Sequence, residues 1–184
     1  MLGACMALAL AGRAHARDVE GVKLPEQVTI GQSTLSLNGA GVRTKFLVKV
    51  YVGGLYLQSP TSDAGAVIAA DQPRRIVLVL LHDLSKDQMS SSFREAFEAN
   101  AGDRMDSLRE RMGRFEGFLQ SGHPGDWMAI TYQPGRGVTV VNKAGNWIVI
   151  PGKDFADALF SVWLGPHPAD SGLKKAMLSP RPTG

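Results

Sequence analysis

NGAGVRTKFLVKVYVGGLYL, residues Asn38 to Leu57, is the stretch that decides the fold. It places Arg43 just after a Gly-Ala-Gly segment, which can take backbone angles closed to other residues, so we predict a bend there. From Phe46 onward, the Val, Tyr and Leu content is typical of a half-buried strand. The bend should direct the Arg43 cation toward whatever covers the sheet. Gly53 and Gly54 interrupt the same strand and indicate a bulge or the close approach of another group.

Length and composition predict a single globular domain. The chain has 184 residues, of which 44% are hydrophobic and 20% charged, enough for one core. No apolar run reaches the roughly 18 residues of a membrane-spanning helix, so we expect no stable membrane insertion of the mature domain. The net charge is only +3, and the arginines between residues 104 and 114 alternate with acidic residues. This pattern is that of a solvated helix face and excludes nucleic acid as an expected partner.

The first residues are typical of an export signal. An apolar run over residues 2–12 precedes Ala14-His15-Ala16, a small-x-small pattern like that of a signal-peptidase site. We therefore predict a signal peptide over residues 1–16, a domain over residues 17–184, and an exported, periplasmic protein. A buried N-terminal helix is the alternative. Cleavage would remove Cys5, the only cysteine, and with it any disulfide or thiol chemistry.

The periodicity of the remaining chain separates strands from helices. We expect strands at residues 21–24, 27–30, 46–57, 74–81, 127–132, 137–142 and 146–150. We expect helices at residues 64–70, from an N-cap at Ser85 to about residue 119 with a break near Ala101-Gly102, and at 154–164 and 173–178. The strand at 74–81 is apolar without alternation, so both of its faces should be covered. Segregated blocks of this kind predict an α+β domain whose helices cover an antiparallel sheet.

Three segments carry a resemblance to a known family. Asn38–Arg43, Val50–Leu57 and Phe160–Gly165 resemble motifs of the chalcone isomerase family, and the whole chain is similar to exported bacterial chalcone-isomerase-like proteins. The resemblance implies an open-faced antiparallel β-sheet covered on one face by a layer of α-helices. It also implies a ligand cleft between the two layers.

The resemblance also implies an activity with named residues. Plant members close a flavanone ring by attack of a phenolate on an enone, with an arginine, a threonine, a tyrosine and an asparagine around the reacting atoms. Arg43 matches the arginine, while the threonine position falls at Tyr51, the tyrosine near Met89 and the asparagine near Ala96. Asn100, one helical turn beyond Ala96, would be a displaced substitute. The missing polar groups weigh against isomerase activity.

The residues that remain are suited to an organic acid. A guanidinium pairs two-pronged with a carboxylate, and the Tyr51 hydroxyl could add a third donor on the same face. Fatty-acid-binding members of the family are thought to hold ligands in this way. The apolar bed for a tail would come from Phe46, Leu55, Phe93, Phe97 and Trp163. The full set of predicted ligand-binding residues is Arg43, Tyr51, Phe46, Met89, Phe93, Asn100 and Ser161.

Structural roles for these residues remain open as alternatives. Arg43 could bind loop carbonyls, Tyr51 could be a core residue with one hydrogen-bond partner, and Ser161 could pack among apolar helical neighbours. The three histidines after residue 16, His82, His123 and His167, are too far apart in sequence to indicate a metal site. We therefore expect no metal and no cofactor.

Two functions follow from the sequence. The first is an exported protein that binds a small apolar acid, such as a fatty acid, without turnover. The second is an intramolecular lyase acting on a phenolic or enone ligand, with Arg43 and Tyr51 as catalytic residues and Arg43 stabilising an oxyanion. The only candidate acids or bases near the inferred cleft are Tyr51 and Tyr56, whose ordinary pKa is far from neutral. This favours binding.

Overall fold

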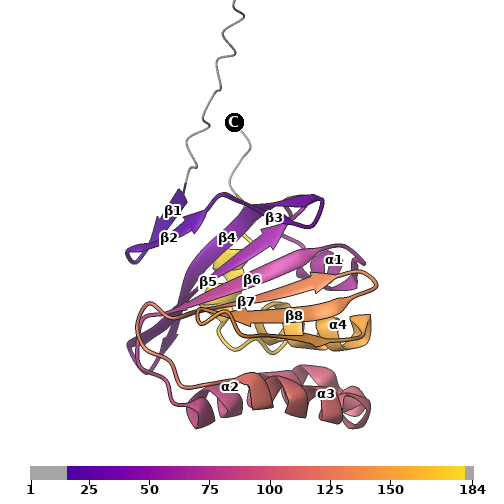
Figure 1. The fold of residues 1–184 in the computed structure, drawn as a ribbon. Helices are drawn as coiled ribbons and strands as arrows, with labels where there is room; N and C mark the ends of the chain where they lie inside the picture. Colours follow the sequence, from indigo (N-terminus) through magenta and orange to yellow (C-terminus); the bar gives the residue numbers. More distant parts are fainter. Residues whose placement is uncertain (1–15, 181–184) are drawn as a thin grey trace, which may run out of the picture.

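The computed structural model describes residues 16–180. Its main element is a seven-stranded antiparallel sheet in the order β3-β4-β5-β6-β7-β8-β9, so that each strand pairs with the next along the chain (Figure 1). A separate two-stranded sheet, β1-β2, precedes it. The predicted export segment lies outside the described residues, apart from Ala16, which begins β1.

The strands and helices have the following bounds. The strands are β1 (Ala16–Val19), β2 (Val22–Pro25), β3 (Gln27–Ile30), β4 (Ser33–Lys45), β5 (Val48–Leu57), β6 (Arg74–Leu80), β7 (Trp127–Gln133), β8 (Gly137–Asn142) and β9 (Trp147–Ile150). The helices are α1 (Ala64–Ala69), α2 (Lys86–Ala101), the short 3-10 turn η1 (Gly102–Arg104), α3 (Met105–Phe118), α4 (Lys153–Leu164) and α5 (Ser171–Met177). No helix within residues 16–180 is long and apolar enough to span a membrane.

The helices cover one face of the sheet, with α4 at the centre of the layer. Helix α4 is apolar almost all round and is buried over most of its length, because α2 and α3 lie outside it (Figure 1). Phe93 of α2 packs edge-on against Trp163 of α4, with ring centroids 5.6 Å apart, and against Phe115 of α3 at 5.0 Å. The predicted α+β class, with helices over one face of an antiparallel sheet, is confirmed.

The opposite face of the sheet carries a second, smaller apolar cluster. It contains Leu24 of β2 together with Leu37, Val52 and other residues of β3 to β5. The outward side chains of β6 and the residue after it, including Val77 and Val79, pack against this cluster. Both faces of β6 are therefore covered, which explains its apolar sequence without alternation.

Local signals set the start of α2. Ser85 is its N-cap as predicted, and its Oγ accepts a hydrogen bond from the Gln88 N–H at 3.2 Å. The Gln88 side chain accepts in turn from the Ser85 N–H at 3.0 Å, which completes a capping box. The helix ends at Gly102, which has a positive φ of 53°, so the predicted break is also found.

The predicted bend at Gly39-Ala40-Gly41 is wrong. These residues lie inside β4 and pair with Gly53 to Leu55 of β5. The chain reverses instead at Phe46-Leu47, where both residues have positive φ, and β5 begins only at Val48. The prediction failed because it assigned the glycines to backbone freedom, whereas they are needed for packing.

The group that comes close to these glycines is α5. A side chain added at Gly39 would meet the backbone carbonyl of Ala176, and a Cβ at Gly41 would lie 2.5 Å from the Ala176 Cβ. A Cβ at Gly53 would lie 2.6 Å from the Met177 Cε. Gly39, Gly41 and Gly53 therefore form a shallow seat in which α5 lies directly on the sheet.

Candidate ligand-binding site

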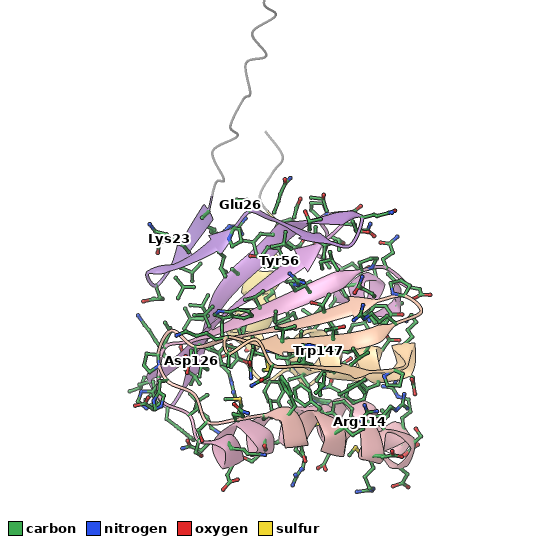
Figure 2. The ribbon with its side chains drawn as sticks, viewed as in Figure 1. Lys23, Glu26, Tyr56, Arg114, Asp126 and Trp147 are labelled. Carbon is green, nitrogen blue, oxygen red and sulfur yellow. The ribbon has the colours of Figure 1, made fainter. Side chains whose placement is uncertain are left out.

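A cavity of about 770 Å³ lies between the sheet and the helices. It is bounded by the β4–β5 hairpin, β6, the first turns of α2, residues 118–122, the start of β7 and the end of β8. Asp126, labelled in Figure 2, belongs to its lining and marks the end of the molecule where the cavity is found. Its volume is within the usual range of small-molecule sites, about 300–1,000 Å³.

Arg43 and Tyr51 form the polar end of this cavity. They lie directly opposite one another in the β4–β5 register, and both line the cavity. The Arg43 Cζ lies 5.6 Å from the centroid of the Tyr51 ring, within the range of a cation–π contact. Within residues 16–180, no carboxylate lies within ion-pair distance of Arg43. Its guanidinium is therefore able to accept an anion from outside the chain.

The Tyr51 hydroxyl is fixed by a tryptophan. The indole Nε1 of Trp163 donates to the Tyr51 hydroxyl oxygen at 3.0 Å, and both side chains are buried. Burial raises the pKa of Tyr51 above its ordinary value, although Arg43 and the Trp163 hydrogen bond oppose the increase. The hydroxyl is therefore neutral at physiological pH. The described part of the chain supplies no acceptor for its hydrogen, which can be donated to a ligand beside Arg43.

Apolar side chains make up most of the remaining lining. Leu78 and Leu80 project into the cavity from β6, Met89 and Phe93 from α2, and Val162 from α4. The lining also includes Val50, Leu84, Phe118, Leu119 and Met128. The cavity thus joins one cationic, hydrogen-bonding end to an apolar interior.

The structure brings five of the predicted ligand-binding residues together. Arg43, Phe46, Tyr51, Met89 and Phe93 all line the cavity. They come from the β4–β5 hairpin and from α2, which the chain places on two sides of the same space.

Asn100 and Ser161 do not line the cavity. The Asn100 amide donates to the carbonyl of His167 at 2.8 Å and accepts from its N–H at 3.1 Å, which ties α2 to the segment after α4. The Ser161 hydroxyl donates to the carbonyl of Asp157 one turn earlier in α4, at 2.7 Å. Both polar groups are therefore used within the protein.

The predicted apolar bed needs a similar correction. Leu55 and Phe97 are fully buried in the core and do not line the cavity. Trp163 acts on the site through its hydrogen bond to Tyr51, and it does not line the cavity itself.

Sequence reasoning missed several lining residues. Side chains alternate between the two faces of a strand, so Leu78 and Leu80 lie on the same face of β6. This spacing could have indicated that they act together. Phe118 ends α3, Trp127 begins β7 and Lys143 follows β8. Only the tertiary fold brings these three residues to the cavity. No group of three metal-ligating side chains occurs within the described residues.

Comparison with known proteins identifies the family. The family model described as chalcone isomerase-like matches residues 16–179, almost the whole of the described part. The chain belongs to the chalcone isomerase-like family. This confirms the predicted resemblance to the family, whereas bacterial origin and export stay predictions.

A solved structure shows the same fold as this chalcone isomerase-like protein. The fatty-acid binding protein of Arabidopsis thaliana superimposes with a TM-score of 0.65 at 18% sequence identity. The match covers 86% of this chain and 92% of the plant chain. No match was found among curated proteins. At this identity, the plant structure establishes a shared curled sheet with helices on one side.

Proposed function

We propose that this protein binds a small fatty-acid-like acid in the cavity between its sheet and its helices, without turnover. The observation that carries the proposal is the position of Arg43. Its guanidinium has no carboxylate partner within residues 16–180 and lies beside the Tyr51 hydroxyl at the polar end of an apolar cavity. An acid with an apolar tail complements both parts of that cavity.

The carboxylate end of the ligand would be held by two kinds of donor. Arg43 would supply a charged, planar fork that matches the two carboxylate oxygens. Tyr51 would supply a neutral O–H, because its raised pKa keeps it protonated and Trp163 holds the hydroxyl oxygen in place. The tail would then remove apolar surface of the lining from water, at roughly 25 cal/mol per Å².

The plant structure of the same fold supports this proposal, since it is named as a fatty-acid binding protein. The electrostatics of Tyr51 also argue against a role as general base. A general base must be deprotonated near neutral pH. Burial raises the pKa of Tyr51 further above neutral, so its hydroxyl keeps its proton. We place the binding outside the cytoplasm, in the periplasm, because of the export segment expected over residues 1–16.

Native mass spectrometry of the protein purified from its own compartment tests the proposal. We expect a co-purifying organic acid on the wild-type chain, on the control variant Arg136→Ala, and not on Arg43→Ala. Arg136 is an exposed residue of the β7–β8 turn that lies outside the cavity lining, which makes it a matched loss of one arginine.

An equal load on wild type and Arg43→Ala would contradict the role of Arg43. An empty wild-type protein that also fails to take up palmitate would contradict acid binding itself. Turnover of phenolic enones by that empty protein, lost in Arg43→Ala, would support an intramolecular lyase instead.

A further inference from the structure

The turn between β4 and β5 exposes two large apolar side chains at its tip. Phe46 is 89% exposed and Leu47 is 97% exposed, the highest values among the large hydrophobic residues of the described chain. Val48 and Trp127 are also exposed, and both line the cavity together with Phe46. A group of exposed apolar residues at the rim of a cavity is typical of an interaction surface.

The backbone of this turn makes its apolar sequence more unusual. Phe46 and Leu47 have φ angles of 48° and 67°, so the two-residue turn requires the left-handed region at both positions. Such turns favour Asn-Gly or a similar pair, because a residue with a Cβ is strained in this region. The β1–β2 turn has the same signs of φ and uses Glu20-Gly21. Folding alone therefore does not account for Phe-Leu at the tip.

Two cations next to the tip have no carboxylate partner within the described residues, although the Asp170 carboxylate accepts a hydrogen bond from the Thr44 N–H at 3.2 Å. Lys45 precedes Phe46, with its Nζ 6.0 Å from the centre of the Phe46 ring, and within residues 16–180 neither Lys45 nor Arg43 has a carboxylate partner at ion-pair distance. Lys49 and Lys143, also at this end, are each paired with a carboxylate. The tip thus presents apolar side chains beside unpaired cations, the combination that binds an anionic lipid surface.

We propose that the Phe46-Leu47 tip inserts into the headgroup region of an anionic membrane and so directs the mouth of the cavity toward the bilayer. The cavity would then exchange its apolar ligand with the lipid phase and not with bulk water. The identity of the cargo rests on the proposed function, whereas the docking itself rests on the exposed tip and its charges.

Vesicle sedimentation tests the docking, with vesicles of phosphatidylcholine alone and of phosphatidylcholine containing phosphatidylglycerol. We expect the wild type to bind the anionic vesicles more strongly, and added salt to weaken that binding. Phe46→Asn with Leu47→Gly should weaken it by about tenfold or more, as expected for the loss of two inserted apolar side chains. The wild type and all variants should be prepared with the same N-terminus, so that residues 1–16, if present, contribute equally to vesicle binding in each sample.

Two controls separate loss of docking from loss of folding. The Asn-Gly pair is favoured in this turn, so the double variant should unfold at a higher denaturant concentration than the wild type. Trp147→Gln removes a 62% exposed apolar side chain from β9 that does not line the cavity, and this variant should bind vesicles like the wild type.

The proposal would be overturned if the wild type bound neither kind of vesicle. It would also be overturned if the double variant bound the anionic vesicles as strongly as the wild type. A tip-dependent dimer that does not bind vesicles would show that the tip contacts a second copy instead. Titration of palmitate without vesicles keeps the two proposals apart. Vesicle binding without palmitate binding would contradict only the proposed function, and palmitate binding without vesicle binding would contradict only the docking.

Discussion

The indole N–H of Trp163 donates a hydrogen bond of 3.0 Å to the hydroxyl oxygen of Tyr51, linking the central helix α4 to the second strand of the cavity hairpin. This contact fixes the Tyr51 hydroxyl, a neutral donor beside Arg43. It also holds the hydroxyl at the cavity although no residue of the described chain accepts its hydrogen.

Trp163→Phe should therefore affect both the stability of the protein and the pKa of Tyr51. The change keeps an aromatic ring but removes the donor, and we expect the free energy of unfolding to fall by about 1–3 kcal/mol. The pKa of Tyr51 should rise further, because the Trp163 hydrogen bond lowers it. Urea unfolding and an absorbance titration of tyrosine measure the two effects. Unchanged values in both would show that the hydrogen bond is not formed in solution.

Stability should fall at alkaline pH because of the tyrosines. All three tyrosines have raised pKa values, mainly through burial, and those of Tyr56 and Tyr132 reach about 12. A folded-state pKa above the unfolded value of about 10 gives stability that is complete below pH 10 and is lost as the pH rises toward 12. Urea unfolding at a series of pH values from 8 to 11 measures this loss of stability.

Tyr56→Phe provides the matched control for this pH dependence. The Tyr56 hydroxyl, labelled in Figure 2, is buried and has no hydrogen-bond partner within the described residues, so its removal should cost little at pH 8. Above pH 10, the variant should lose less stability than the wild type. Identical slopes for the two proteins would contradict the raised pKa of Tyr56.

Two Gly→Ala changes, one in the glycine seat of α5 and one on an exposed helix position, should have opposite effects on stability. Gly39→Ala would place a methyl group against the Ala176 carbonyl, and we expect a loss of about 1–3 kcal/mol. Gly113→Ala in α3 meets nothing within 4 Å and should gain up to about 1 kcal/mol through helix propensity. Thermal and urea unfolding compare the two. A Gly39→Ala protein as stable as the wild type would show that α5 does not lie on this strand.

Asn100 should behave as a structural residue. Asn100→Ala removes two hydrogen bonds to His167, and a loss of about 1–3 kcal/mol in unfolding free energy is expected. Palmitate affinity should stay within about twofold of the wild type, because Asn100 lies outside the cavity lining. Calorimetric titration and urea unfolding give the two values, and a selective loss of affinity at unchanged stability would return Asn100 to the site.

The fold could be predicted well because its local signals agree with one another. Ser85 marked the start of α2, Gly102 marked its end, and the unbroken apolar pattern of β6 indicated cover on both faces. The Gly39–Gly41 segment misled because glycine has the same sequence signature whether it provides backbone freedom or room for packing. Only the position of α5, far away in sequence, distinguishes the two uses.

The site could be predicted in part. Arg43 and Tyr51 were predicted from the family resemblance, and the structure places them opposite each other in the antiparallel pairing of β4 with β5. Asn100 was assigned to the site from its place in the helix, which carries no information on its hydrogen bonds to a segment 67 residues later. The strained Phe46-Leu47 turn was read as the start of a strand, since apolar residues seldom occupy such turns.

Calorimetric titration of palmitate and of the matching long-chain alcohol, into wild type and Arg43→Gln, tests the central claim most directly. Because the alcohol lacks the carboxylate, the comparison isolates the contact between Arg43 and the headgroup. We predict that Arg43→Gln weakens palmitate by about 2–5 kcal/mol and leaves the alcohol almost unchanged. Equal losses for both ligands, or no loss for palmitate, would contradict the grip of Arg43 on an acid.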